Sequence, residues 1–244
     1  MSVPRKRAQQ KRKRARTRMA PEARREQLLQ VASEVFAAKG YRMASVTDVV
    51  EGAGIGRGTF YLYFDSKKDV FLELIEQYFS DFEELLRDNH DRLRDSVKSN
   101  GDVLRTWRDN IVRILEYHRD NPSLTYVVYR EALGSDEDFS ERVDELSGVA
   151  RMMFHEQFDL MKQHRLIRPV GLDIVASIVM GSTVYVIMEH IMKGGGPDLQ
   201  RLADEVMEYH VRALMPPGPG LEAALRSLST KGARQPKKAV AKVG

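Results

Sequence analysis

The sequence contains no cysteine among its 244 residues. A chain without cysteine has no disulfide framework, no thiolate metal site and no cysteine nucleophile, and it suits a reducing compartment. No apolar run follows the charged N-terminal segment, so we expect no signal peptide and a cytoplasmic location. The most apolar segment, residues 172–192, is free of charge only over 174–188, which is too short for a membrane span.

The sequence also lacks the alternation of apolar and polar residues that marks β-strands, and it has no internal repeat. Apolar residues instead recur at helical spacing from residue 21 onwards. We therefore predict an all-α protein with a three-helix DNA-binding head over residues 20–65. A larger helical domain would follow over residues 66–215.

Charge is distributed unevenly along the chain. Residues 1–18 contain nine Lys and Arg and no acid, and residues 219–244 carry a net charge of +5. Because the whole chain carries +4, the 200 residues between these ends carry −10. We expect residues 1–19 to form a disordered basic arm and residues 216–244 a disordered basic tail. An acidic body confines contact with a polyanion to the region near the N-terminus.

The stretch from residue 45 to residue 67 is the most informative part of the chain. Ser45 and Asp48 match a capping box, and Gly54 can supply the left-handed residue that ends a short helix. A second helix follows, in which Phe60 and Phe64 lie four residues apart and face inward. Arg57, Thr59 and Tyr61 lie on the opposite side of this second helix. Two helices joined by a glycine-containing turn, with these side chains outward, predict a DNA-reading helix-turn-helix.

The head resembles the TetR family of bacterial transcriptional repressors over residues 24–75. The matching blocks are Phe36-Ala37-Ala38-Lys39-Gly40-Tyr41, Val46-Thr47-Asp48-Val49, Ala53-Gly54-Ile55 and Gly58-Thr59-Phe60-Tyr61-Leu62-Tyr63-Phe64-Asp65-Ser66-Lys67. The resemblance implies a homodimer whose heads read an inverted-repeat operator on double-stranded DNA. It also implies that the larger domain binds a small-molecule effector and dimerises through its last two helices.

The resemblance further implies which residues contact DNA. Arg57 and Thr59 would read base edges, while Tyr61 would contact phosphate. The full expected set is Ser45, Thr47, Arg57, Gly58, Thr59, Tyr61, Tyr63 and Lys67. Gly56 departs from the family, in which a Ser or Thr cap is common at that place.

Aromatic side chains in the second half of the chain are candidates for an effector pocket, with ordinary core packing as the alternative. The candidates are Trp107, Tyr117, Tyr126, Tyr129, Phe154, Phe158 and Tyr185. A mostly apolar lining favours a lipophilic or aromatic effector.

The segment from residue 171 to residue 193 is apolar on too many faces to pack against one core. It predicts a dimer seam in which Gly181 and Ser182 allow close approach of a second helix. A fully buried central helix is the alternative.

Two other functions are compatible with parts of the sequence. His155, Glu156 and Asp159 resemble a zinc-binding motif whose second histidine is replaced, which would suit a helical metal-binding protein or enzyme. The basic ends would suit a nonspecific nucleic-acid-binding protein. We favour a ligand-responsive transcriptional repressor that is not an enzyme, without a metal or a cofactor.

Overall fold

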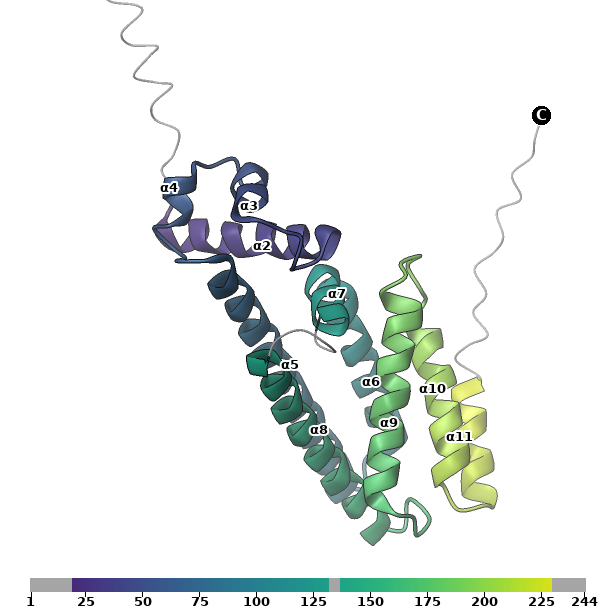
Figure 1. Ribbon diagram of the computed structural model, residues 1–244. Helices are drawn as coiled ribbons and strands as arrows, with labels where there is room; N and C mark the ends of the chain where they lie inside the picture. The colour runs from purple at the N-terminus through teal and green to yellow at the C-terminus, as the bar shows by residue number, and fades with distance from the viewer. Residues whose placement is uncertain (1–18, 132–136, 230–244) are drawn as a thin grey trace, which may run out of the picture. The chain divides into compact units, whose positions relative to one another are not determined.

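The computed structural model describes residues 19–131 and 137–229, and the chain divides into two compact units between Leu74 and Ile75. Within these ranges every regular element is helical, which confirms the predicted all-α class (Figure 1). The first unit contains the helices α2 (Pro21–Lys39), α3 (Val46–Gly52), α4 (Arg57–Phe60) and the start of α5 (Lys67–Lys98). It therefore extends beyond residue 65, where we expected the head to end.

Aromatic side chains form the core of the first unit. Phe36 from α2 and Phe60 from α4 are almost completely buried. The ring of Phe36 meets that of Phe71 edge to face, with 5.9 Å between centroids, and Phe60 lies 5.8 Å from Phe64. The guanidinium of Arg25 lies 4.7 Å from the centroid of Phe64. These contacts join α2 to the start of α5 and hold α4 and the residues after it in place, with large buried side chains of defined geometry.

The local signals of the helix-turn-helix are present as predicted. The hydroxyl of Ser45 accepts a hydrogen bond from the backbone N–H of Asp48 at 3.3 Å, and the Asp48 carboxylate accepts one from the Ser45 N–H at 2.8 Å. Gly54 has a φ of 63°, and the N–H of Ile55 donates to the carbonyl of Val50 at 3.0 Å. α4 then begins at Arg57, with Gly56 as its N-cap.

The second unit is a bundle of long helices. It contains the rest of α5 and the helices α6 (Val103–Asp120), α7 (Pro122–Glu131), α8 (Glu137–Gln163), α9 (Leu172–Val186), α10 (Leu199–Leu214) and α11 (Pro219–Ser229). α8 packs on α9, α6 packs on α10, and α10 packs on α11. The core between them includes Leu93, Leu115, Phe158, Met161, Ile187 and Met207.

Two elements differ from the sequence-based expectation. The helix expected over 171–193 changes at Val186 into a π-helical turn, Ile187–Ile191. The disordered tail expected over 216–244 instead includes α11, because Ala224, Leu225 and Leu228 bury one apolar face against the core. Residues 230–244 and the basic arm at 1–18 lie outside the described residues.

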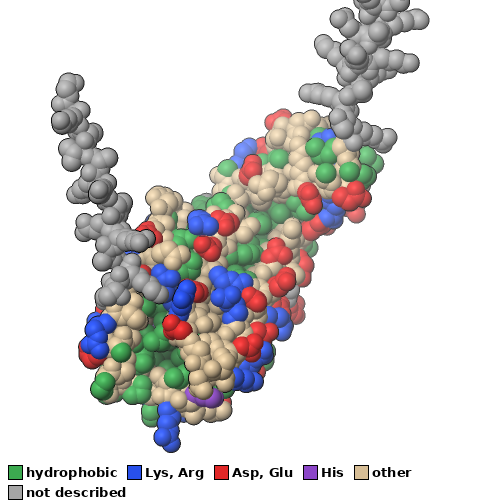
Figure 2. Space-filling model, turned by 180° about the vertical axis from the view of Figure 1, so that it is seen from behind, with side chains coloured by type: hydrophobic (Ala, Val, Ile, Leu, Met, Phe, Trp, Pro, Cys, Tyr) green, Lys and Arg blue, Asp and Glu red, His purple; other side chains and the backbone are tan. Residues whose placement is uncertain are grey.

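α9 and its π-helical continuation form the most apolar segment of the described chain. By length and composition alone Leu172–Ile191 could cross a membrane, with a mean hydropathy of 1.6, and 22% of its most apolar window is buried. Core helices of water-soluble proteins pass the same test. Figure 2 shows one face of the molecule, on which acidic and basic side chains lie side by side with apolar side chains exposed between them.

Candidate DNA-binding surface and effector cavity

The recognition helix α4 is positioned by its buried side and exposes the other. Phe60 and Phe64 are buried, whereas Arg57 and Gly58 are exposed and Thr59 is half-buried. Tyr61 is 44% exposed, and its hydroxyl accepts a hydrogen bond from Nη2 of Arg57 at 3.2 Å. Arg57, expected to read a base edge, and Tyr61, expected to contact phosphate, are therefore hydrogen-bonded to each other on the surface.

The start of α3 offers a second exposed group. Thr47 is exposed, as contact with a phosphate requires. Ser45 is also exposed, but its hydroxyl donates to the Asp48 carboxylate at 2.8 Å. Hydrogen bonds from Lys39 and Ser45 lower the pKa of Asp48 to about 2, so this carboxylate stays charged and holds the Ser45 hydroxyl. Of these two expected contacts, only Thr47 has its hydroxyl without a hydrogen bond among the described residues.

Lys67 has a different environment from the one expected of a DNA contact. Its ammonium donates to the carbonyls of Tyr41 at 2.7 Å and Ala44 at 2.8 Å, and it lies 4.5 Å from the centroid of the Tyr41 ring. These contacts tie the start of α5 to the segment before α3. Tyr63, another expected contact, is partly buried. Lys67 therefore has a structural role in the head, and its expected contact with DNA stays a prediction.

Two exposed apolar side chains of the head were not singled out from the sequence. Leu62 is 79% exposed and directly follows Tyr61, and Met43 is 80% exposed in the segment before α3. A large apolar side chain beside an expected DNA contact is suited to contact the methyl group of thymine. The only signal for them in the sequence is that neither fits the apolar spacing of the helices around it.

The second unit contains two small adjoining cavities, of about 30 Å³ and about 60 Å³. Their linings share side chains from α5, α6, α8 and α9. The shared residues are Leu86, Ile114, Ala150, Phe154 and Thr183. The first cavity also has polar residues in its wall, namely Asn89, Asn110 and Gln157, while the second is almost wholly apolar.

The aromatic candidates for the pocket separate into two groups. Trp107 lines the first cavity, Tyr129 lines the second, and Phe154 lines both. The other four, Tyr117, Tyr126, Phe158 and Tyr185, line neither cavity. Phe158 is buried behind Trp107 in the core, and Tyr117 donates its hydroxyl to the carbonyl of Tyr78. Tyr185 is 64% exposed and lines neither cavity, so the structure does not place it in the expected pocket.

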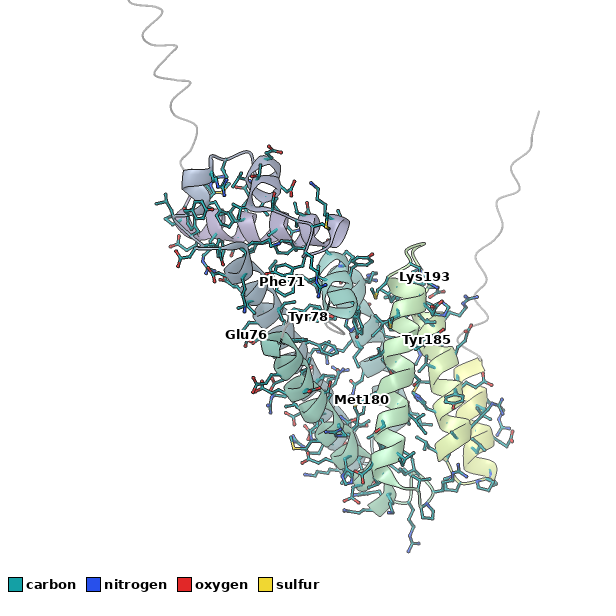
Figure 3. The ribbon with its side chains drawn as sticks, in the orientation of Figure 1. Phe71, Glu76, Tyr78, Met180, Tyr185 and Lys193 are labelled. Carbon is teal, nitrogen blue, oxygen red and sulfur yellow. The ribbon has the colours of Figure 1, made fainter. Side chains whose placement is uncertain are left out.

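A buried histidine lies behind the second cavity. Nδ1 of His118 is 2.8 Å from the hydroxyl of Tyr78, which Figure 3 labels on α5, and 3.3 Å from that of Thr125. The ring also packs against Phe82 and Tyr129, two residues of the cavity wall. Burial lowers the pKa of His118 to about 3, so the ring is neutral at physiological pH.

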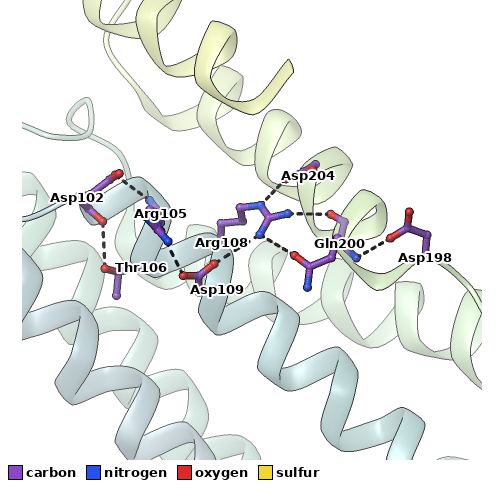
Figure 4. Close-up of polar contacts among 8 residues, drawn as sticks. All are labelled: Asp102, Arg105, Thr106, Arg108, Asp109, Asp198, Gln200 and Asp204. Atoms are coloured by element: carbon purple, nitrogen blue, oxygen red, sulfur yellow. Dashed lines mark hydrogen bonds and ion pairs between the residues drawn. The ribbon is translucent and has the colours of Figure 1, made fainter. Parts of the chain in front are cut away.

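A polar network joins α6 to α10 (Figure 4). Arg108 is 9% exposed, and its Nε donates to the carboxylate of Asp204. Its Nη1 donates to Oε1 of Gln200 at 2.9 Å and lies 3.5 Å from Asp109. The hydrogen bond that Arg108 donates to Asp204 is the main cause of the raised pKa of Arg108. Since α6 also forms the cavity wall, this network fixes that wall to α10.

The histidines do not assemble a metal site in the part of the chain that the structure describes. No group of three or more His, Asp or Glu side chains there could hold a metal ion. His155 lies 3.8 Å from Asp173, and His90 lies 3.6 Å from Glu156. His118 is directed to Tyr78 and Thr125. The zinc-like motif thus forms separate polar pairs.

A helix-turn-helix head joined to a helical domain with an internal cavity defines a DNA-binding transcriptional regulator. The profile described as bacterial regulatory proteins of the tetR family matches residues 28–74. The uncharacterized HTH-type transcriptional regulator YdgC of Bacillus subtilis is 27% identical over 200 residues, which cover 80% of this chain and 94% of that relative. The head, over residues 28–74, therefore has the sequence of a TetR-family regulator, and the chain as a whole is similar to transcriptional regulators of that kind.

Solved structures share the same fold. The ketosteroid transcriptional regulator KstR2 of Mycobacterium tuberculosis is similar with a TM-score of 0.63 and 23% identity, over 81% of this chain and 98% of that one. The transcriptional regulator FadR of Bacillus subtilis, in complex with stearoyl-CoA, has a TM-score of 0.56 and 20% identity, over 75% of this chain and 95% of that one. At these identities the likeness extends to the fold alone.

Proposed function

We propose that the protein is a homodimeric repressor that binds an inverted-repeat operator and is released by a lipophilic effector. It acts in the cytoplasm as a regulator without catalytic activity. One observation carries this proposal: α9 forms part of the cavity wall on one side and exposes an apolar face on the other. An effector that reshapes the cavity would therefore act directly on the surface proposed to hold the dimer together.

The exposed face of α9 supports the dimer. Ile174, Ile178, Gly181 and Tyr185 follow one another at intervals of three or four residues, and all four are exposed. Such spacing places them along one side of a helix. Met180, labelled with Tyr185 in Figure 3, lies on another side and lines the second cavity. An apolar stripe of this kind is suited to pack against the same stripe of a second copy.

α10 contributes less to the proposed seam than the sequence led us to expect. Met207, Val211 and Leu214 are buried within their own chain, where α10 packs on α6 and α11. Its large exposed apolar residue is Tyr209, at 59% exposure. The proposed interface therefore consists mainly of α9, with α10 at its margin.

The cavity walls support a lipophilic effector. The FadR structure of similar fold is a complex with stearoyl-CoA, and KstR2 is named a ketosteroid transcriptional regulator; both agree with an apolar cavity here. The two cavities are far smaller than the roughly 300–1,000 Å³ of typical ligand sites. Binding must therefore widen them, and we propose that the side chains that α9 contributes to the wall take part in this movement. Release from DNA requires that the effector bind this widened state more tightly than the operator-binding state.

Selection of bound sequences from random DNA with the full chain tests the proposed operator. We expect an inverted repeat, bound by a dimer with measurable affinity in an anisotropy titration. Enrichment of single, non-repeated sites would contradict dimeric recognition. A screen of lipophilic compounds for loss of operator binding then tests the effector.

Arg57 is expected to read a base edge. An Arg57→Ala variant should lose about 1–3 kcal/mol of operator binding per half-site and become less selective at one position of each half-site. Arg151→Ala removes an exposed arginine of α8 and serves as the control for loss of charge. Affinity should be measured on the selected operator and on random DNA. An equal loss of affinity on both would indicate that Arg57 contacts a phosphate group and does not read a base.

The basic arm is expected to strengthen binding without reading sequence. Each phosphate contact steepens the dependence of log K on log salt by about 0.9, so deletion of residues 1–18 should flatten this slope by several units. Sequence preference should persist, apart from A·T-rich flanks if the arm enters the minor groove. Deletion of residues 230–244 removes five Lys and Arg from the other end and serves as the control. An unchanged slope after deletion of residues 1–18 would indicate that the arm is a solvated tail that does not contact phosphate.

A further inference from the structure

We propose that Gln157 is the polar anchor of the effector, and that the effector is an apolar molecule with one uncharged carbonyl or hydroxyl group. This inference rests on the proposed function, because it assigns the chemistry of the same cavity. Gln157 belongs to α8, lines the first cavity and is 8% exposed. Within the described residues its carboxamide has no hydrogen-bond partner, and its nitrogen and oxygen are not among the fully enclosed polar atoms, as expected of a group that opens onto the cavity.

The two asparagines of the same wall are already satisfied. The side-chain amide of Asn89 donates to the carbonyl of Asn110 at 3.2 Å, and that of Asn110 donates to the carbonyl of Asn89 at 2.7 Å. Their side-chain oxygens accept from arginines, Asn89 from Arg113 at 2.7 Å and Asn110 from Arg92 at 3.3 Å. This pair closes α5 against α6, and the side-chain oxygen and nitrogen of each asparagine are already bonded within the chain.

The other polar groups near the cavities either lie outside the first cavity or are already bonded, and Tyr129 lines only the second cavity. The hydroxyl of Thr183 donates to the carbonyl of Val179 at 2.8 Å. Nε2 of His118 and Nδ1 of His210 are buried without a partner among the described residues, but neither histidine lines a cavity. The carboxamide of Gln157 is thus the group that a ligand in the first cavity would meet.

The lining also determines the charge of the ligand. Among the described residues no Lys, Arg, Asp or Glu lines either cavity. A carboxylate or ammonium placed there would be desolvated without an opposite charge, at a cost of several kcal/mol. A carbonyl or hydroxyl group needs only one hydrogen bond, which a carboxamide can donate or accept.

The position of the apolar part follows from the shared wall. Leu86, Ile114 and Phe154 border both cavities. A chain anchored at Gln157 would pass these residues and reach Met180 and Ile187 in the second, apolar cavity. The ligand therefore has its polar group at one end and its hydrocarbon part at the other.

Trp107 provides the readout, because it is the single tryptophan of the chain and lines the first cavity. Its fluorescence should be titrated with decan-2-one, decanoate at pH 8 and dec-1-ene. We expect decan-2-one to bind about tenfold or more tighter than decanoate. Gln157→Met keeps the length of the side chain. It should weaken the binding of decan-2-one about 5- to 10-fold, which corresponds to the loss of one hydrogen bond. Binding of dec-1-ene should be unchanged or tighter.

Gln163→Leu is the matched control, since Gln163 is an exposed residue of α8 that donates to Asp159. It should bind all three probes as the wild type does. Gln157→Leu gives a second test if Gln157→Met melts at a lower temperature. Unchanged binding of decan-2-one by both Gln157 variants, equal binding of decanoate, or no binding of any probe by the wild type would overturn the inference. Operator binding without any probe is measured separately, and its absence would overturn the proposed function instead.

Discussion

A Gly181→Arg variant should be a monomer at micromolar concentration and should bind the operator about 100-fold more weakly or worse. Gly181 is exposed in the middle of the α9 stripe, between Ile178 and Tyr185. A Cβ at this position would meet no atom within 4 Å of its own chain, so the monomer should accept the arginine. In the proposed dimer the long charged side chain would lie in an apolar seam. Loss of the linkage between two half-site contacts removes a factor of about 10²–10⁴ in affinity.

Light scattering and an operator titration measure the two effects together. Gly148→Arg is the control, because a Cβ at Gly148 of α8 would also meet nothing within 4 Å. It should remain dimeric and bind DNA as the wild type does. A wild-type protein that is monomeric at the same concentration would contradict the proposed dimer. A Gly181→Arg variant that stays dimeric would place the seam elsewhere.

The head could be predicted almost completely because its signals are local. The capping box at Ser45, the left-handed Gly54 and the spacing of Phe60 and Phe64 each act within a few residues of the chain. Such signals can be recognised in the sequence without knowledge of the tertiary packing. Lys67 shows the limit, since its place in the sequence indicated DNA while its ammonium bonds to carbonyls more than twenty residues away.

The cavity could be predicted only in part because it depends on contacts between distant helices. Trp107 and Phe154 were recognised as aromatic, but so was Tyr185, which the turn of α9 places outside. Gln157 had no signal, because a glutamine on a helix rich in charge looks like a surface residue. Its burial follows from how α8 packs, which the sequence of α8 alone does not determine. α11 was missed because the Pro and Gly residues before it suggested disorder.

An Asp204→Ala variant should lose about 3 kcal/mol of folding free energy in the second unit, the cost of leaving a buried charge unpaired. Asp204 is the main partner of Arg108, whose side chain is 10% exposed, and the pair joins α6 to α10. Gln200 would still accept one hydrogen bond but carries no charge, and the more exposed carboxylate of Asp109, 3.5 Å away, would compensate only weakly for the lost partner. For a chain of this size the loss corresponds to a decrease of about 6–12 °C in melting temperature.

Two further variants separate the charge pair from simple packing. Asp109→Ala removes a carboxylate that is 39% exposed and 3.5 Å from Arg108, and it should cost less than about 1 kcal/mol. A double variant, Arg108→Met with Asp204→Leu, removes both charges and should recover most of the stability, because apolar residues can replace a buried ion pair at little cost. Thermal melts followed by circular dichroism compare the three. If Asp204→Ala melts no lower than Asp109→Ala, the pair does not hold α6 to α10. If instead the double variant is as unstable as Asp204→Ala, the loss comes from packing, and the unpaired guanidinium is not its cause.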